Sequence, residues 1–198
     1  MPNLPPGTQA LLIANVLIFL LQIAGLEPTL ITYFALWPLG GDSGEPSFMP
    51  WQLVTYAFLH GGLTHLLFNM FALYMFGAQV EAVYGRDRLL LYYFVCVVAA
   101  ALTQLLVTAL LGTYGPTIGA SGGVFGLLFA YARLFPHRTV MLLFPPIPMP
   151  AWLFVTIYGA IELFMGVTGS GQGVAHFAHL GGILGGYLLI RYGRGLRR

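Results

Sequence analysis

Residues 89–111 read LLLYYFVCVVAAALTQLLVTALL, an apolar run that holds no charged side chain. A helix needs about 20 mainly apolar residues to cross the roughly 30 Å of hydrocarbon in a bilayer, so this run is long enough to span a membrane. Similar runs, bounded by glycine, proline or charged residues, recur on both sides of it. They predict an all-α, polytopic membrane protein with spans near residues 9–26, 63–80, 89–111, 121–135, 152–167 and 174–190.

The composition argues against a soluble globule. Of the 198 residues, 58% are hydrophobic and 7% are charged, whereas soluble domains carry about 25% charged residues. Six short spans with tight loops use the whole chain, so we expect one membrane domain over residues 1–198. No charged segment and no small-residue cleavage site frame the first apolar run as a signal peptide. We therefore expect a retained span and an N-terminus that is mature as written.

The basic residues, all of them arginine, indicate the orientation. They follow the second, fourth and sixth spans, so all fall on one side of the membrane, which the positive-inside rule makes cytoplasmic, with both termini inside. The segment 27–51 then lies outside, and its aromatic residues favour the outer interface. The absence of lysine and of long soluble extensions fits a small prokaryotic form, so we expect the bacterial inner (plasma) membrane. The arginines are Arg86, Arg88, Arg133, Arg138, Arg191, Arg194, Arg197 and Arg198.

The fourth span is short. Residues 121–135 would rise about 22 Å as a helix, less than the hydrocarbon thickness of about 30 Å. Arg133 and Arg138 tie its inner end to the cytoplasmic side, and Gly115, Pro116 and Gly119 argue against extending it outward. Non-helical backbone at that depth has to be buried in protein or face a water-filled cavity. The sequence therefore predicts a recessed, hydrated pocket at the start of this helix.

Polar side chains gather at the outer ends of three spans. Ionisable and amide groups inside a membrane are costly, so each is a candidate functional residue. The second, fourth and sixth spans all start from outside, which places their first residues at a similar depth. The polar residues there are His60, His65, Asn69, Ser121, His176 and His179.

This set fits peptide-bond hydrolysis. A serine nucleophile needs a base within about 2.6 to 3.2 Å and donors for the developing oxyanion. Ser121 with a histidine meets the first need. His65 and Asn69, four residues apart on one helical face, are candidate oxyanion donors. The amide of Ser121 joins them, because a helix N-terminus favours negative charge.

Glycines at four-residue spacing give the helices the means to approach each other. Small residues in this pattern let membrane helices pack closely. A serine on the fourth span and a histidine on the sixth can then meet. The pairs are Gly119 with Gly123, Gly122 with Gly126, Gly181 with Gly185, and Gly182 with Gly186.

Four motifs resemble those of the rhomboid family of intramembrane serine proteases. The run GASG at residues 119–122 is similar to the family's GxSG nucleophile motif, and AHLGGILG at 178–185 to its AHxxGxxxG base motif. The run HGGLTHLLFN at 60–69 is similar to the HxxxN element with its preceding structural histidine. Gly77, Glu81 and Gly85 resemble the GxxxExxxG pattern. One departure is that the family's common Trp-Arg pair in the first outer loop reads Trp51-Gln52 here, which bears on how that loop is anchored.

The resemblance implies a rhomboid-like six-transmembrane-helix bundle with an interfacial first loop. It also implies a dyad of Ser121 and His179 that cleaves transmembrane segments of other proteins near small or helix-destabilising residues. In this arrangement Phe125 packs against the ring of His179, and the fifth span gates lateral substrate access. Gly119, Gly122, His60 and His176 have supporting roles.

Glu162, in the fifth span, is a second candidate partner for the base. We expect it to form a hydrogen bond near the outer end of its helix or to line the cavity, and not to complete a triad. We expect no metal or cofactor, because no HExxH occurs and the carboxylates are predicted away from the histidines. His176 competes with His179 as base, but only His179 precedes the Leu-Gly-Gly context.

Two other functions stay open. One is a catalytically inactive rhomboid-like protein that binds membrane clients, although this chain keeps both serine and histidine. The other is a small channel or transporter. That function would explain the polar side chains at one depth, but not why Ser121 and His179 lie in glycine-rich motifs. The partners we expect are transmembrane protein substrates and the lipid bilayer. Nucleic acid has no support, and the oligomeric state is unknown.

Overall fold

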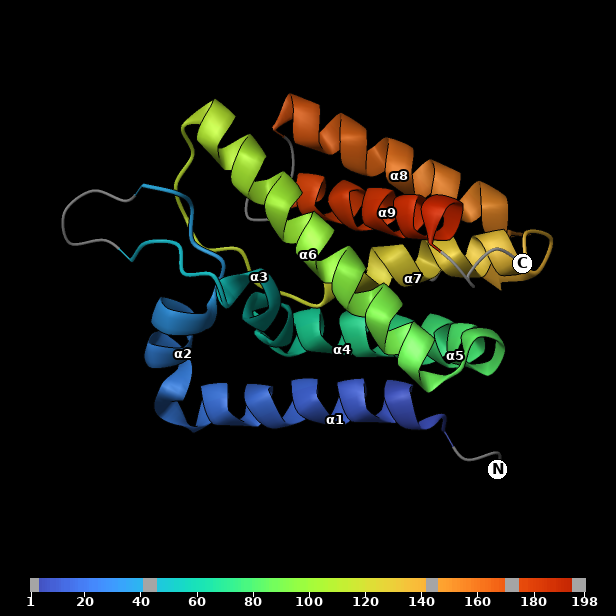
Figure 1. The fold of residues 1–198 in the computed structure, drawn as a ribbon, viewed down its shortest axis with the longest axis horizontal. Helices are drawn as coiled ribbons and strands as arrows, with labels where there is room; N and C mark the ends of the chain where they lie inside the picture. Colours follow the sequence, from blue (N-terminus) through green and yellow to red (C-terminus); the bar gives the residue numbers. More distant parts are fainter. Residues whose placement is uncertain (1–3, 41–45, 142–145, 170–174, 194–198) are drawn as a thin grey trace.

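The structure, a computed structural model, describes residues 4–40, 46–141, 146–169 and 175–193. It is mainly helical (Figure 1). Turns of π-helix join α1 to α2 and α4 to α5, and a short 3-10 turn follows α3. The helices are α1 Pro6–Leu21, α2 Glu27–Phe34, α3 Gln52–Thr55, α4 Leu63–Ala72, α5 Ala78–Tyr84, α6 Arg86–Leu111, α7 Ser121–Leu134, α8 Ala151–Thr168 and α9 His176–Tyr192.

Almost all described residues of each predicted span are helical: the first span falls on α1 and the π turn after it, the second on α4, a π turn and α5, and the other four on α6, α7, α8 and α9. Among the described residues, four helices are long and apolar enough to cross a membrane: Pro6–Phe34, Leu63–Tyr84, Arg86–Leu111 and Ala151–Thr168. The prediction of a polytopic, all-α membrane protein is confirmed. The count of six spans stays a prediction, because α7 and α9 are shorter. Residue 174, where the sixth span was expected to begin, lies outside the described residues.

Two local features differ from the expectation. The segment after residue 26 was expected to be a loop, but Glu27–Phe34 is helical, since an acidic residue and Pro28 in the first turn favour a helix start. Gly25, with φ of 101°, turns the chain into it. The second feature is a short antiparallel pair of strands between α7 and α8, β1 Thr139–Met141 and β2 Pro148–Pro150.

Gln52 anchors the first loop. Its side chain is fully buried, and its Oε1 accepts hydrogen bonds from the backbone amides of Trp37 and Met49, both at 3.2 Å. The indole of Trp51 donates to the carbonyl of Tyr33 at 2.9 Å. The Trp-Gln pair therefore fixes the loop with a neutral amide.

Glycine contacts hold α7 and α9 together at the centre of the bundle. α9 lies against α6, α7 and α8 (Figure 1), and α7 is buried on nearly every face. A Cβ added at Gly182 would overlap the carbonyl of Gly122, and one at Gly126 would overlap the thiol of buried Cys96. The two backbones are therefore as close as glycine allows.

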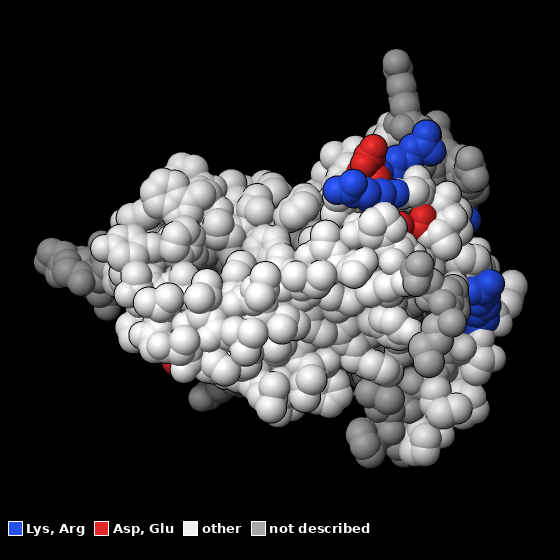
Figure 2. All heavy atoms as spheres, turned by 90° about the horizontal axis from the view of Figure 1, so that it is seen from below, with Lys and Arg blue, Asp and Glu red and all other residues white. Residues whose placement is uncertain are grey.

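The charged residues gather at one end of the molecule. Figure 2 shows the basic side chains and most of the acidic side chains visible from that side at the end that holds α5 and the start of α1. Much of the remaining surface is apolar, with exposed side chains such as Leu17, Leu106 and Phe164. An apolar belt above one charged end fits a protein embedded in lipid. Arg194, Arg197, Arg198 and the acidic Asp42 and Glu45 lie outside the described residues.

Candidate active site

Ser121 is the first residue of α7 and lines a cavity of about 550 Å³. The chain reaches it through Gly119, whose φ is 123° and whose amide donates to the carbonyl of Tyr56 at 3.0 Å. A residue at this position has an amide without a partner inside the helix. The structure thus places a hydroxyl and the start of a helix in one cavity, where the sequence predicted a pocket. The depth and hydration of this pocket in a membrane stay predictions.

The ring of His179 faces this hydroxyl. The distance from His179 Nε2 to Ser121 Oγ is 2.8 Å. The contact is possible because α7 and α9 touch at Gly122 and Gly182. Phe125, one turn into α7, stacks on the imidazole with ring centroids 4.4 Å apart and planes 9° apart. The imidazole is therefore held edge-on to Ser121.

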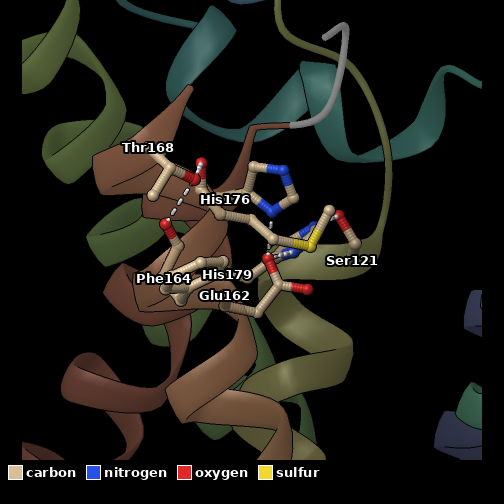
Figure 3. Close-up of polar contacts among 7 residues, drawn as sticks. Ser121, Glu162, Phe164, Thr168, His176 and His179 are labelled. Atoms are coloured by element: carbon tan, nitrogen blue, oxygen red, sulfur yellow. Dashed lines mark hydrogen bonds and ion pairs between the residues drawn. The ribbon is translucent and has the colours of Figure 1, made fainter. Parts of the chain in front are cut away.

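Glu162 occupies the other side of this imidazole. Its Oε2 lies 2.8 Å from Nδ1 of His179 and 2.6 Å from Nδ1 of His176 (Figure 3). All three side chains are buried. The hydrogen bond expected for Glu162 is present, whereas the expectation that the carboxylates lie away from the histidines is wrong. That Ser121 and His179 act as a dyad stays a prediction. Glu162 does not line the cavity in which Ser121 lies.

Glu162 was a candidate partner of the base from the sequence, but the contact was not favoured, because it depends on how α8 is rotated against α9. The sequence did indicate that a partner exists, because a carboxylate inside a membrane is costly unless it is paired. Gln22, a polar side chain within the first predicted span, also needs a partner, and it was not singled out from the sequence. Its side chain forms two hydrogen bonds with the backbone of His60, at 3.0 and 3.1 Å.

Glu162, His176 and His179 also form a candidate metal-binding group, with ligand atoms within 4.8 Å of one another. Ligands of tetrahedral zinc, each about 2.0 to 2.1 Å from the ion, lie about 3.3 Å apart. The two Nδ1 to Oε2 distances of 2.6 and 2.8 Å are shorter and match charge-assisted hydrogen bonds. The spacing fits a proton-sharing cluster better than a metal site.

His65 and Asn69 line the same cavity from α4. The amide of Gly61 donates to Nδ1 of His65 at 3.3 Å, so the proton of the neutral ring is on Nε2. A Cβ built on Gly119 would lie 2.8 Å from this Nε2 and 3.7 Å from Ser121 Oγ, so this nitrogen lies close to the space beside Ser121. Asn69 uses one amide hydrogen on the carbonyl of His65, at 3.0 Å, and has a second.

His60 is part of the support behind this donor. It is buried in the connection before α4, with its ring 5.1 Å from that of His65. Burial, aided by the proximity of His65, lowers the pKa of His60 to about 4. His60 is therefore neutral near pH 7 and adds no charge beside the cavity.

The comparisons with known proteins agree over most of the chain. The model of the rhomboid domain matches residues 47–195. The mitochondrial presenilin-associated rhomboid-like protein of Homo sapiens is 27% identical over 203 residues, which cover 98% of this chain and 51% of that protein. Rhomboid protease GluP of Bacillus subtilis is 32% identical over 137 residues, covering 69% of this chain and 25% of that protein.

Rhomboid protein 1 of Saccharomyces cerevisiae mitochondria is 32% identical over 146 residues, covering 69% of this chain and 40% of that protein. The chain thus spans about half, or less, of the length of these curated relatives. The matched region includes every helix from α3 to α9. The chain belongs to the rhomboid family.

Proposed function

We propose that this protein is an intramembrane serine endopeptidase that hydrolyses peptide bonds in or near transmembrane segments of other membrane proteins. The observation that carries the proposal is the 2.8 Å contact between Ser121 and His179 at the wall of a cavity. Family membership and the positions of His65 and Asn69 support it. No metal or cofactor has a step in the proposed reaction.

In the proposed reaction, Ser121 Oγ attacks the carbonyl carbon while its proton passes to His179 Nε2. A C–O bond forms, and the carbonyl electron pair moves onto the oxygen beside His65, Asn69 and the Ser121 amide. Collapse of this intermediate breaks the C–N bond, and His179 returns the proton to the leaving amine. Water then repeats the sequence on the acyl-enzyme and frees Ser121.

The walls of the cavity suggest how a transmembrane substrate reaches Ser121. Phe68 and Phe71 of α4 line the cavity and are also 55% and 45% exposed. Phe154 and Tyr158 of α8 line the same cavity. We propose lateral access between α4 and α8, so that a substrate helix passes from lipid to Ser121 without crossing water.

Localisation is proposed in two parts. The arginine-rich end lies in the cytoplasm with both termini, and the cavity opens toward the opposite side. The membrane is the bacterial inner membrane. The relatives named above include mitochondrial and bacterial proteins, so they support an integral membrane protein and do not choose between these membranes.

A cleavage assay in liposomes with a model transmembrane substrate tests the activity. Ser121→Ala and His179→Ala are expected to abolish cleavage, whereas His176→Ala leaves measurable turnover. Equal loss at both histidines would contradict the choice of base. Substrate that binds wild-type protein and is never cut would favour an inactive, client-binding protein.

A further inference from the structure

Glu162 is the buried carboxylate that the proposed dyad leaves unused. It lies on α8, whereas the two histidines that it contacts lie three residues apart on one face of α9. Glu162 is 8% exposed, His176 6% and His179 8%, so bulk water does not solvate this carboxylate. Its hydrogen bonds from the two rings therefore replace hydration.

The contact fixes which ring nitrogen of His179 carries the proton. An ionised carboxylate accepts hydrogen bonds and donates none. Nδ1 of His179 is therefore the protonated nitrogen, 2.8 Å from Glu162 Oε2. The lone pair is then on Nε2, which is the nitrogen 2.8 Å from Ser121 Oγ. The opposite tautomer would place a proton where the base has to accept one.

We propose that Glu162 is a positioning residue of the reaction, so that Ser121, His179 and Glu162 work as a three-membered relay. This rests on the protease function proposed above. Glu162 holds the imidazole in the productive tautomer and stabilises the imidazolium that forms when Ser121 loses its proton. The interaction between the carboxylate and the imidazole is strongest when the ring becomes positive. Because the ring is more positive in the transition state than in the ground state, this interaction increases the rate.

His176 has a secondary part in the relay. It donates to the same oxygen, Oε2, from a ring perpendicular to that of His179, with an interplanar angle of 87°. It fixes the carboxylate but does not face Ser121. Its replacement is expected to slow cleavage less than replacement of Glu162.

The test combines three variants with a pH–rate profile in detergent. Glu162→Gln keeps the shape and removes the charge, and we expect kcat to fall about 10²- to 10⁴-fold, as when the carboxylate of a serine-protease triad is replaced. The acid limb of the profile is expected to move to lower pH, because the imidazolium loses its negative neighbour. Glu162→Asp should restore part of kcat, and His176→Asn should keep the wild-type acid limb.

Glu81→Gln is the matched control, because Glu81 is also a buried carboxylate. It accepts three hydrogen bonds at 2.7 Å from Gly7 and Thr8 at the start of α1. This control is expected to lower the Tm and leave the pH profile unchanged. If Glu162→Gln behaves in the same way, its role is structural and the relay is wrong.

Nitrogen-15 NMR of the histidine rings tests the tautomer in the wild-type protein, so a variant that fails to fold does not block the test. The expected result is a protonated Nδ1 on His179, and a proton on Nε2 instead would overturn the relay. Ser121→Ala separates the two proposals. If Ser121→Ala cleaves normally, the proposed protease function is wrong. If Ser121→Ala is inactive and Glu162→Gln cleaves at the wild-type rate, only the relay is wrong.

Discussion

At the scale of single residues, the absence of a side chain at Gly119 keeps open the space in which the oxyanion is expected to lie. A side chain there meets two obstacles, a φ of 123° and Nε2 of His65 at 2.8 Å from the new Cβ. Backbone strain of this kind costs about 1–3 kcal/mol. We expect Gly119→Ala to lower the Tm and, by displacing His65, to slow cleavage about 100-fold.

Gly61→Ala is the control for that prediction. Its Cβ would lie 3.7 Å from Ile118 and 3.8 Å from His65, ordinary contact distances, and its φ is not positive. Its amide still donates to His65. Tm and turnover are both measured, and equal losses in the two variants would refute the space-filling argument.

The two α4 donors give a second prediction at this scale. His65→Ala and Asn69→Ala are each expected to lower kcat about 10²- to 10³-fold, the usual effect of losing one oxyanion donor. The double variant should lose less than the product of the single losses, because both side chains are proposed to donate to the same oxyanion and so are not independent. Wild-type kcat in the double variant would exclude an oxyanion role for both.

The residues predicted from the sequence and those missed differ in kind. The meeting of Ser121, His179, His65 and Asn69 at one cavity was predictable, because each lies near the start of a span and depth follows from topology, whereas their catalytic roles stay a prediction. His179 was a candidate partner of Glu162, but the sequence could not decide this contact, because contact across helices depends on rotation about their axes, which hydropathy does not encode. An intramembrane carboxylate signals that a partner exists without naming it.

At the scale of helices, the approach of α7 to α9 sets the distance between nucleophile and base. A methyl group at Gly182 would overlap the carbonyl of Gly122, backbone against backbone. We expect Gly182→Ala to destabilise the protein by about 1–3 kcal/mol or more, as overpacking does. It should also slow cleavage, because Ser121 and His179 lie on the two separated helices.

Gly159→Ala on α8 is the matched control, since its Cβ would meet only Ile183, at 3.9 Å. It is expected to leave the Tm unchanged or to raise it, because alanine favours a helix by about 1 kcal/mol over glycine. Thermal unfolding and cleavage are measured together. A wild-type Tm and rate in Gly182→Ala would show that the glycine contact does not set the spacing.

The helices could be predicted from the sequence, because a long apolar run that crosses a bilayer has few stable structures other than a helix. The exceptions are short segments whose structure depends on neighbours. The helix Glu27–Phe34 was hidden within a segment expected to be an aromatic loop, although Glu27 and Pro28 form a helix start signal. The strands at 139–141 and 148–150 are three residues each, too short to show a period.

At the scale of the whole molecule, the charged end defines an orientation that labelling can test. His137 is exposed at the arginine-rich end, whereas Leu39 is 56% exposed in the first loop. With an impermeant maleimide on intact cells, we expect Leu39→Cys to react and His137→Cys to react only after lysis. The wild-type protein gives the background, because Cys96 is fully buried. The reverse pattern would invert the proposed topology.

The central claim is that Ser121 is a nucleophile activated by His179 inside the membrane domain. Labelling with a fluorophosphonate, followed by mass spectrometry of the digested protein, tests it most directly. The account predicts one adduct on Ser121 in the folded protein, lost in Ser121→Ala and in heat-denatured samples and strongly reduced in His179→Ala. Folded wild-type protein that carries no adduct, or carries it on another residue, would contradict the account.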